Sequence, residues 1–249
     1  TGIGYKALEG ITTGGSNVAV GGQALDANTT ASNNTAVGTS ALGANTTGAS
    51  NTSVGQGSLA ANTTASNNTA VGLTALTANT TGADNVAVGM QALKANTTAS
   101  FNVAIGKNSM EANTEGANNT AVGRESLASN TTASHNTAIG YNSLLVNTTG
   151  ESNVAVGSQS LDANTTGLNN TAVGRQALDN NTTGSRNVAV GTNALDANTT
   201  ADHNTAIGDG ALKSNTTGTT NVAVGSASGD AFTTGSSNTA IGTSALSAA

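Results

Sequence analysis

The sequence predicts an all-β protein, a parallel β-solenoid of about 14.5 coils in which each coil is one 17-residue unit. Three observations predict it. Glycine recurs at every seventeenth position from Gly4 to Gly242 without an insertion, and Val or Ile directly precedes all fifteen of these glycines. Asn stands four residues before the glycine in all fourteen complete cases. We therefore expect residues 1–249 to form one continuous repeat region, a segment of a longer fibre.

The composition favours a repeat architecture over an ordinary globule or a disordered chain. Aromatic residues make up 2% of the sequence and charged residues 8%, and Pro, Cys and Trp are absent. Disordered chains are usually rich in charge and Pro, whereas this chain keeps regularly spaced Val, Ile and Leu. The net charge of −6 comes without a basic stripe, so we expect no nucleic-acid partner. No apolar run reaches membrane-spanning length, so we expect no membrane insertion within this segment.

The 17-residue unit is too short for a pair of helices, and its residues favour strand and turn. The run (Thr/Val)-Ala-(Val/Ile) alternates as a strand does, and the following Gly predicts a turn with positive φ or a close backbone approach. Seventeen extended residues cover roughly 56 Å, enough for one circuit of a narrow coil. Nineteen of the twenty charged residues occupy only five positions of the unit, which we interpret as solvent-facing. Glu115 is the exception.

Stacking of the coils places each residue over its equivalent in the next coil. We expect buried columns of Val/Ile and Leu, and asparagine ladders like those of cross-β stacks. Ala stands two residues before the glycine in thirteen of fifteen units, and it points away from its Val and Thr neighbours. Such uniformity on a free surface predicts that another chain packs there. We therefore expect lateral self-association, most simply a homotrimer, with end-to-end polymerisation as a further mode.

Several units carry a resemblance to a known family. The runs Asn-Val-Ala-Val-Gly at 85–89 and Asn-Thr-Ala-Ile-Gly at 136–140 resemble repeats in the heads of trimeric autotransporter adhesins (YadA-like). The longer unit is similar to fibre proteins of bacteria and phages, including tail fibres. The resemblance covers essentially the whole chain and implies left-handed parallel β-rolls with three chains in each fibre. The usual coil of the adhesin family is shorter than the unit found in this chain.

The sequence predicts no enzyme, no cofactor and no metal site. No nucleophile–base–acid set is present, and His135 and His203 lie four coils apart, too distant to share a metal ion. Asp162, Asp179 and Asp196 stack on consecutive coils. Their carboxylates could hold Ca²⁺, but a solvated acidic stripe is the interpretation we favour, since lysines occupy the same position in other coils.

The Asn-Thr-Thr runs allow two interpretations. Either their side chains carry sugars, or Asn turns inward to satisfy backbone groups while Thr supports the strand. We favour the second for Asn, and the sequence does not decide for Thr. The candidate glycosylation sites are Asn28, Asn45, Asn62, Asn79, Asn96, Asn130, Asn147, Asn164, Asn181, Asn198, Asn215, Thr29, Thr46 and Thr63.

Two coils near the ends of the sequence break the pattern, where Ile11 and Phe232 replace this Asn. We interpret them as candidate joints between stacked segments. The function predicted is a structural or adhesive extracellular fibre, namely an adhesin shaft, a phage tail fibre or a secreted filament, with a host surface or glycan as a further partner. The alternative is a solenoid that recognises glycan, ice or mineral through its Thr and Asn ladders. Ice binding is disfavoured because the two Thr are adjacent and point to opposite sides of an extended strand.

Overall fold

The structure is a computed structural model that describes residues 1–247. The chain divides into two compact units, Thr1–Arg124 and Glu125–Ala249. Both units are parallel β-solenoids with one short strand in each coil, and the described residues contain no helix. The predicted fold class is confirmed. The same repeat runs through both units, and their description as one continuous region stays a prediction from the sequence.

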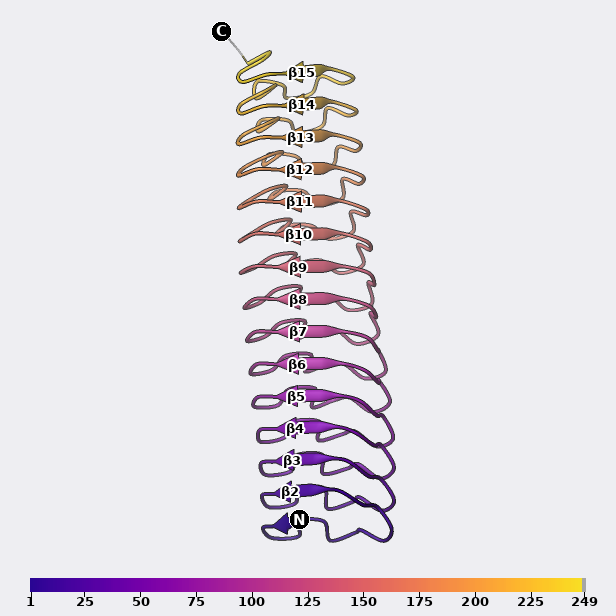
Figure 1. Cartoon of the computed structure of the whole chain (residues 1–249). Helices are drawn as coiled ribbons and strands as arrows, with labels where there is room; N and C mark the ends of the chain where they lie inside the picture. Colours follow the sequence, from indigo (N-terminus) through magenta and orange to yellow (C-terminus); the bar gives the residue numbers. More distant parts are fainter. Residues whose placement is uncertain (248–249) are drawn as a thin grey trace. The chain divides into compact units, whose positions relative to one another are not determined.

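The strands of the first unit pair in parallel in the order of the chain, each with the equivalent strand of the next coil, as in the partners Val54 and Val71 (Figure 1). The bounds of these strands are β1 (Gly2–Ile3), β2 (Val18–Val20), β3 (Thr35–Val37), β4 (Thr52–Val54), β5 (Thr69–Val71), β6 (Val86–Val88), β7 (Val103–Ile105) and β8 (Thr120–Val122).

The second unit repeats this arrangement, as in the partners Val173 and Val190. Its strands are β9 (Thr137–Ile139), β10 (Val154–Val156), β11 (Thr171–Val173), β12 (Val188–Val190), β13 (Thr205–Ile207), β14 (Val222–Val224) and β15 (Thr239–Ile241). The constant register between successive strands keeps every side chain over its equivalent, so each unit consists of columns of like residues.

The glycine that follows each strand satisfies both conditions expected for it. Gly72 has a φ of 139°, a conformation that L side chains rarely adopt. A Cβ added to Gly72 would lie 2.4 Å from the carbonyl oxygen of Gly89 in the next coil. The strand therefore ends at this glycine because only a residue without a side chain allows two successive coils to turn this tightly.

The leucine four residues after that glycine adopts a conformation that the sequence does not reveal. Leu25 and Leu76 have φ values of 50° and 49°, in the left-handed region, and both are fully buried. The left-handed region costs roughly 1–2 kcal/mol for an ordinary L residue. Burial of the leucine side chain offsets this cost. The left-handed turn directs the largest side chain of the coil into its interior.

The orientation of the strand is opposite to the one predicted. Ala36 is fully buried, whereas Val37 is 36% exposed, and the middle residue is likewise the buried one in every other three-residue strand, β2 and β4 to β15. The expectation that Val and Ile form a buried column is therefore wrong. So is the inference that the Ala column packs against another chain.

The leucine column explains this orientation. Gly2 takes the place of Ala in the first coil, and a Cβ added to it would lie 3.6 Å from Cδ1 of Leu8. The leucine enters the coil from the opposite wall and leaves room for only a small side chain on the strand. The interior is narrow, and for this reason its strand column is uniformly alanine.

Candidate functional surfaces

The asparagine of the Asn-Thr-Thr run forms a buried ladder inside each unit. The amide nitrogen of Asn62 donates to Oδ1 of Asn45 at 2.9 Å and to the carbonyl oxygen of Ala65 at 3.0 Å. Asn62 is itself fully buried, as are its equivalents in the column. We call this the first asparagine column. Its members are Asn28, Asn45, Asn62, Asn79, Asn96 and Asn113 in the first unit, and Asn130, Asn147, Asn164, Asn181, Asn198 and Asn215 in the second.

A second buried column is formed by the asparagines that precede the strands. The Oδ1 atom of Asn51 accepts the backbone N–H of Asn68 at 2.9 Å, and its amide nitrogen donates to the carbonyl oxygen of Ala65 at 2.9 Å. The carbonyl oxygen of Ala65 thus accepts a hydrogen bond from a side-chain amide of each column. Side-chain amides complete the hydrogen bonding of the coil where its backbone leaves the strand pattern, as buried polar groups require.

This burial argues against sugars on the asparagines. A sugar on Asn62 would have to replace an amide hydrogen that is already bonded inside the coil, and it would not fit in the fully buried position. The inward interpretation that we favoured describes the placement of all eleven candidate asparagines.

The residues Ile11 and Phe232 stand where the first asparagine column stops. Asn215 lies one coil before Phe232, and its buried Oδ1 atom has no hydrogen-bond partner. The aromatic ring of Phe232 lies 3.1 Å from the position of a Cβ added to Gly229, the residue that replaces leucine in this coil. The ring of Phe232 fills the space that the leucine would occupy, so the Asn-to-Phe and Leu-to-Gly departures of this coil have one local cause. Their role as joints stays a prediction.

The two threonines of each run lie in different environments. The hydroxyl groups of Thr29, Thr46 and Thr63 donate to the carbonyl oxygen of the equivalent threonine in the next coil, at 3.2, 3.0 and 3.3 Å. These candidate glycosylation sites are half-buried.

The second threonine of the run is the exposed one. This exposed threonine column comprises Thr13, Thr30, Thr47, Thr64, Thr81 and Thr98 in the first unit. The sequence does not separate the two threonines, because both satisfy the same pattern and only the hydrogen bonds differ, so sugars on Thr29, Thr46 and Thr63 stay a prediction.

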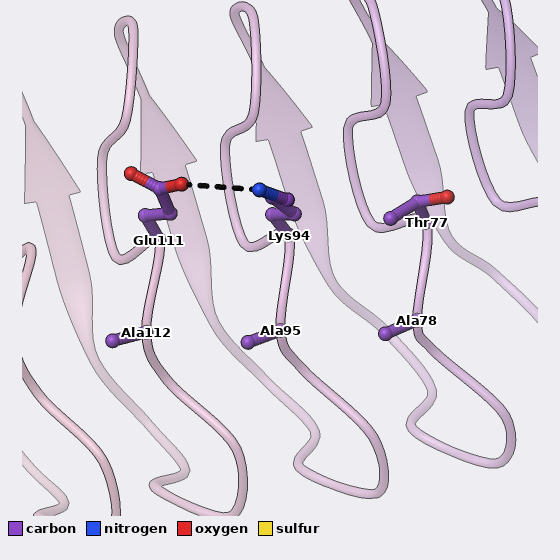
Figure 2. Close-up of a pocket in the computed structure, with 6 residues that line it drawn as sticks. All are labelled: Thr77, Ala78, Lys94, Ala95, Glu111 and Ala112. Carbon is purple, nitrogen blue, oxygen red and sulfur yellow. Dashed lines mark hydrogen bonds and ion pairs between the residues drawn. The ribbon is translucent and has the colours of Figure 1, made fainter.

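A shallow groove of about 410 Å³ crosses three coils of the first unit (Figure 2). Its floor consists of Ala78, Ala95 and Ala112, and the side chains beside the floor are those of Thr77, Lys94 and Glu111. Lys94 Nζ lies 3.4 Å from Glu111 Oε1. This ion pair connects two coils at the surface, where such pairs contribute little to stability. The groove is thus an apolar strip with a neutralised rim.

The equivalent groove of the second unit, of about 350 Å³, carries the acidic stripe. Asp162 and Asp179 line it. Burial raises the pKa of Asp162 to about 6, with the charge of Asp179 acting in the same direction. The pKa of Asp179 is also raised, first by burial and then by Asp196, while a hydrogen bond from Gln176 opposes the shift. Three stacked carboxylates repel one another in the folded chain.

The histidines contribute no site in the described residues. His135 and His203 are both exposed. Within residues 1–247, no three His, Asp or Glu side chains gather in a way that could hold a metal ion.

The outward side of the strands is a second regular surface of each unit. The first and third residues of the three-residue strands β2 to β15 point outward, and we call these two columns the outer strand face. In β4 these residues are Thr52 and Val54, both half-buried, on either side of the buried Ser53. The larger isoleucines protrude further, since Ile105 is 40% and Ile207 41% exposed.

Comparisons of the chain with protein-family models, with curated proteins and with solved structures found no match. No helix long and apolar enough to span a membrane occurs among residues 1–247.

Proposed function

We propose that this chain is a structural element of an extracellular fibre and that it acts without catalysis. The observation that supports this proposal is the identity of the coils. The interior coils share a buried set of Ala, Leu and Asn, from which only Ser53 and Met110 depart, and within each unit hydrogen bonds join each coil to the next. Such an interior specifies repetition in one direction, as in other solenoids.

The exposed positions support the same proposal. Surface positions such as that of Gln56 and Lys107, directly after the glycine, hold residues of unrelated chemistry in successive coils. A chemical task would require one arrangement of side chains, whereas a shaft requires only solubility there. The resemblance of runs such as 85–89 to adhesin heads is consistent with a fibre at a cell or virion surface, namely an adhesin shaft, a phage tail fibre or a secreted filament.

Single-molecule pulling tests the structural role. Because each coil pairs with its neighbour, a terminal coil has fewer partners than an internal one, and coils should detach one after another. Each step should then release one coil, or roughly 55–60 Å of contour length. Regular steps of this size support a load-bearing stack. Unfolding of each unit without resistance to force would contradict the proposed role.

A second candidate function is recognition of glycan, ice or mineral by the exposed threonine column. The observation that favours it is that Thr47, Thr64 and Thr81 are exposed while their hydroxyl groups donate no hydrogen bond within the described first unit. The asparagine ladders are buried and unavailable for such binding. Glycan-array binding, freezing-point depression or adsorption to mineral, lost on Thr64→Val and Thr81→Val, would support this candidate over a plain shaft.

A further inference from the structure

We propose that the outer strand face is the surface on which a second copy of this chain docks. The inference rests on the proposed fibre function and names the surface through which such a fibre associates laterally. The docking surface is then the Val and Ile column, which lies on the outside of the coil, and not the Ala column expected from the sequence, which lies inside it.

A comparison within the outer strand face supports the proposal. The first outward position holds Thr in nine coils and Val in six, as at Thr69 and Val86. The third outward position holds Val in ten coils and Ile in five and is never Thr. Both positions belong to the same strands and share the preference of β-branched residues for sheets. Strand propensity therefore explains the first column, and only a demand for apolar surface explains the third.

Contacts within the chain do not bury the apolar side chains of the third column. Along the complete strands β2 to β15, no residue of the third column is buried, and Ile139 remains 39% exposed after packing against its own neighbours. The face also carries no charged residue in any coil. Charges begin beyond the glycine, at residues such as Lys107 and Arg175. An uncharged aliphatic centre with charges outside it is the usual arrangement of a protein–protein interface.

The area of the face within one unit is close to what a specific association between two copies needs. Each coil contributes a strip about 4.8 Å deep and roughly 12 Å wide, or roughly 60 Å². The eight strands of the first unit then offer roughly 450 Å² and the seven of the second roughly 400 Å². Two copies that dock through the face of the first unit alone bury roughly 900 Å² in total, close to the roughly 1,000 Å² that a specific interface needs.

A second copy also fits the shape of the face. The two outward columns of a strand are roughly 6.6 Å apart, which leaves a furrow between them. The aliphatic column of one copy can enter the furrow of another, as side chains interdigitate where two sheets pack about 10 Å apart. Because both partners present the same columns in the same spacing, the face is complementary to itself.

Analytical ultracentrifugation of the whole chain over a range of concentrations tests the proposal. The wild-type chain should associate, and Val71→Lys should weaken its association at least tenfold, because it places a charge in the middle of the face. The triple variant Val54→Thr, Val71→Thr and Val88→Thr should also weaken association. Its strands should be retained, since Thr already occupies the other column at Thr52 and Thr69. Circular dichroism confirms the fold of each variant.

The matched control is Gln56→Lys. Gln56 is exposed and lies two residues after Val54, at a position where Lys107 and Arg175 stand in other coils. It should associate as the wild-type chain does. A wild-type chain that stays monomeric at its highest soluble concentration, or a Val71→Lys variant that associates like wild type, would overturn the proposal. So would a folded monomer that depresses the freezing point through this face. In each of these cases the stepwise resistance to pulling would still decide the proposed structural role separately.

Discussion

The asparagine columns hold almost only asparagine, and the third column of the outer strand face holds only Val and Ile, but contacts within the chain explain only the first regularity. Within the coil, Asn79 makes hydrogen bonds to Asn62, Gly82 and Asn96. Any other side chain there would leave buried polar groups unpaired. On the outer strand face, Val88 makes ordinary ladder contacts that a threonine would also make, and yet no threonine occurs in that column.

The difference separates two causes of a uniform column in a repeat protein. Where contacts within the chain explain the column, its residues are needed for folding. Where such contacts do not explain it, we infer that its residues are needed for an interaction with another molecule. Substitutions in the asparagine columns should therefore change stability, and substitutions on the outer strand face should change association.

The largest loss of stability is expected for Gly72→Ala. Its φ of 139° and the 2.4 Å approach of Gly89 leave no room for a methyl group, so the coil has to shift. We expect a loss of about 4 kcal/mol in the free energy of unfolding, measured by urea denaturation. Gly15→Ala is the control, because nothing lies within 4 Å of a Cβ added there. Equal losses for the two variants would contradict the turn geometry.

A smaller but still large loss is expected for Asn79→Ala. The change removes two hydrogen bonds that Asn79 donates and one that it accepts from Asn96. Because the groups left behind are buried, we expect a loss of roughly 3 kcal/mol by the same measurement. Thr81→Ala, in the exposed threonine column, should change stability by less than about 0.5 kcal/mol. A mild effect of Asn79→Ala would mean that the ladder contributes little.

The smallest effect is expected from the acidic stripe. Since burial and Asp179 raise the pKa of Asp162 to about 6, the folded chain binds this proton more tightly than the unfolded chain. The stabilisation from the protonated form is complete below pH 3.8 and is lost as the pH rises to about 6. Asp162→Asn should therefore raise the melting temperature slightly at pH 7 and leave it nearly unchanged at pH 4. An equal change at both values would contradict the pKa shift.

The sequence was sufficient for the coil length, the parallel register and the turn at each glycine, because these follow from strict spacing. It did not reveal which side of the strand faces inward. Alternation places Ala36 and Val37 on opposite sides of the strand. Which of the two faces inward depends on Leu25 and its equivalents, whose left-handed conformation cannot be predicted from the local sequence. Nor did it separate Thr29 from Thr30, since only the hydrogen bond from Thr29 to the next coil distinguishes them. Long-range contacts decide both cases.

Cysteine accessibility tests the assignment of the two sides of the strand most directly, because the chain contains no cysteine of its own. Ala70→Cys should stay unreactive toward a thiol reagent while the chain is folded, as Ala70 is fully buried and Ser53 shows that the column accepts a larger atom. Val71→Cys should react readily in dilute solution and become protected as the concentration rises and copies associate. Reaction of Ala70→Cys in the folded chain would contradict the account, as would a Val71→Cys thiol that stays equally reactive at every concentration.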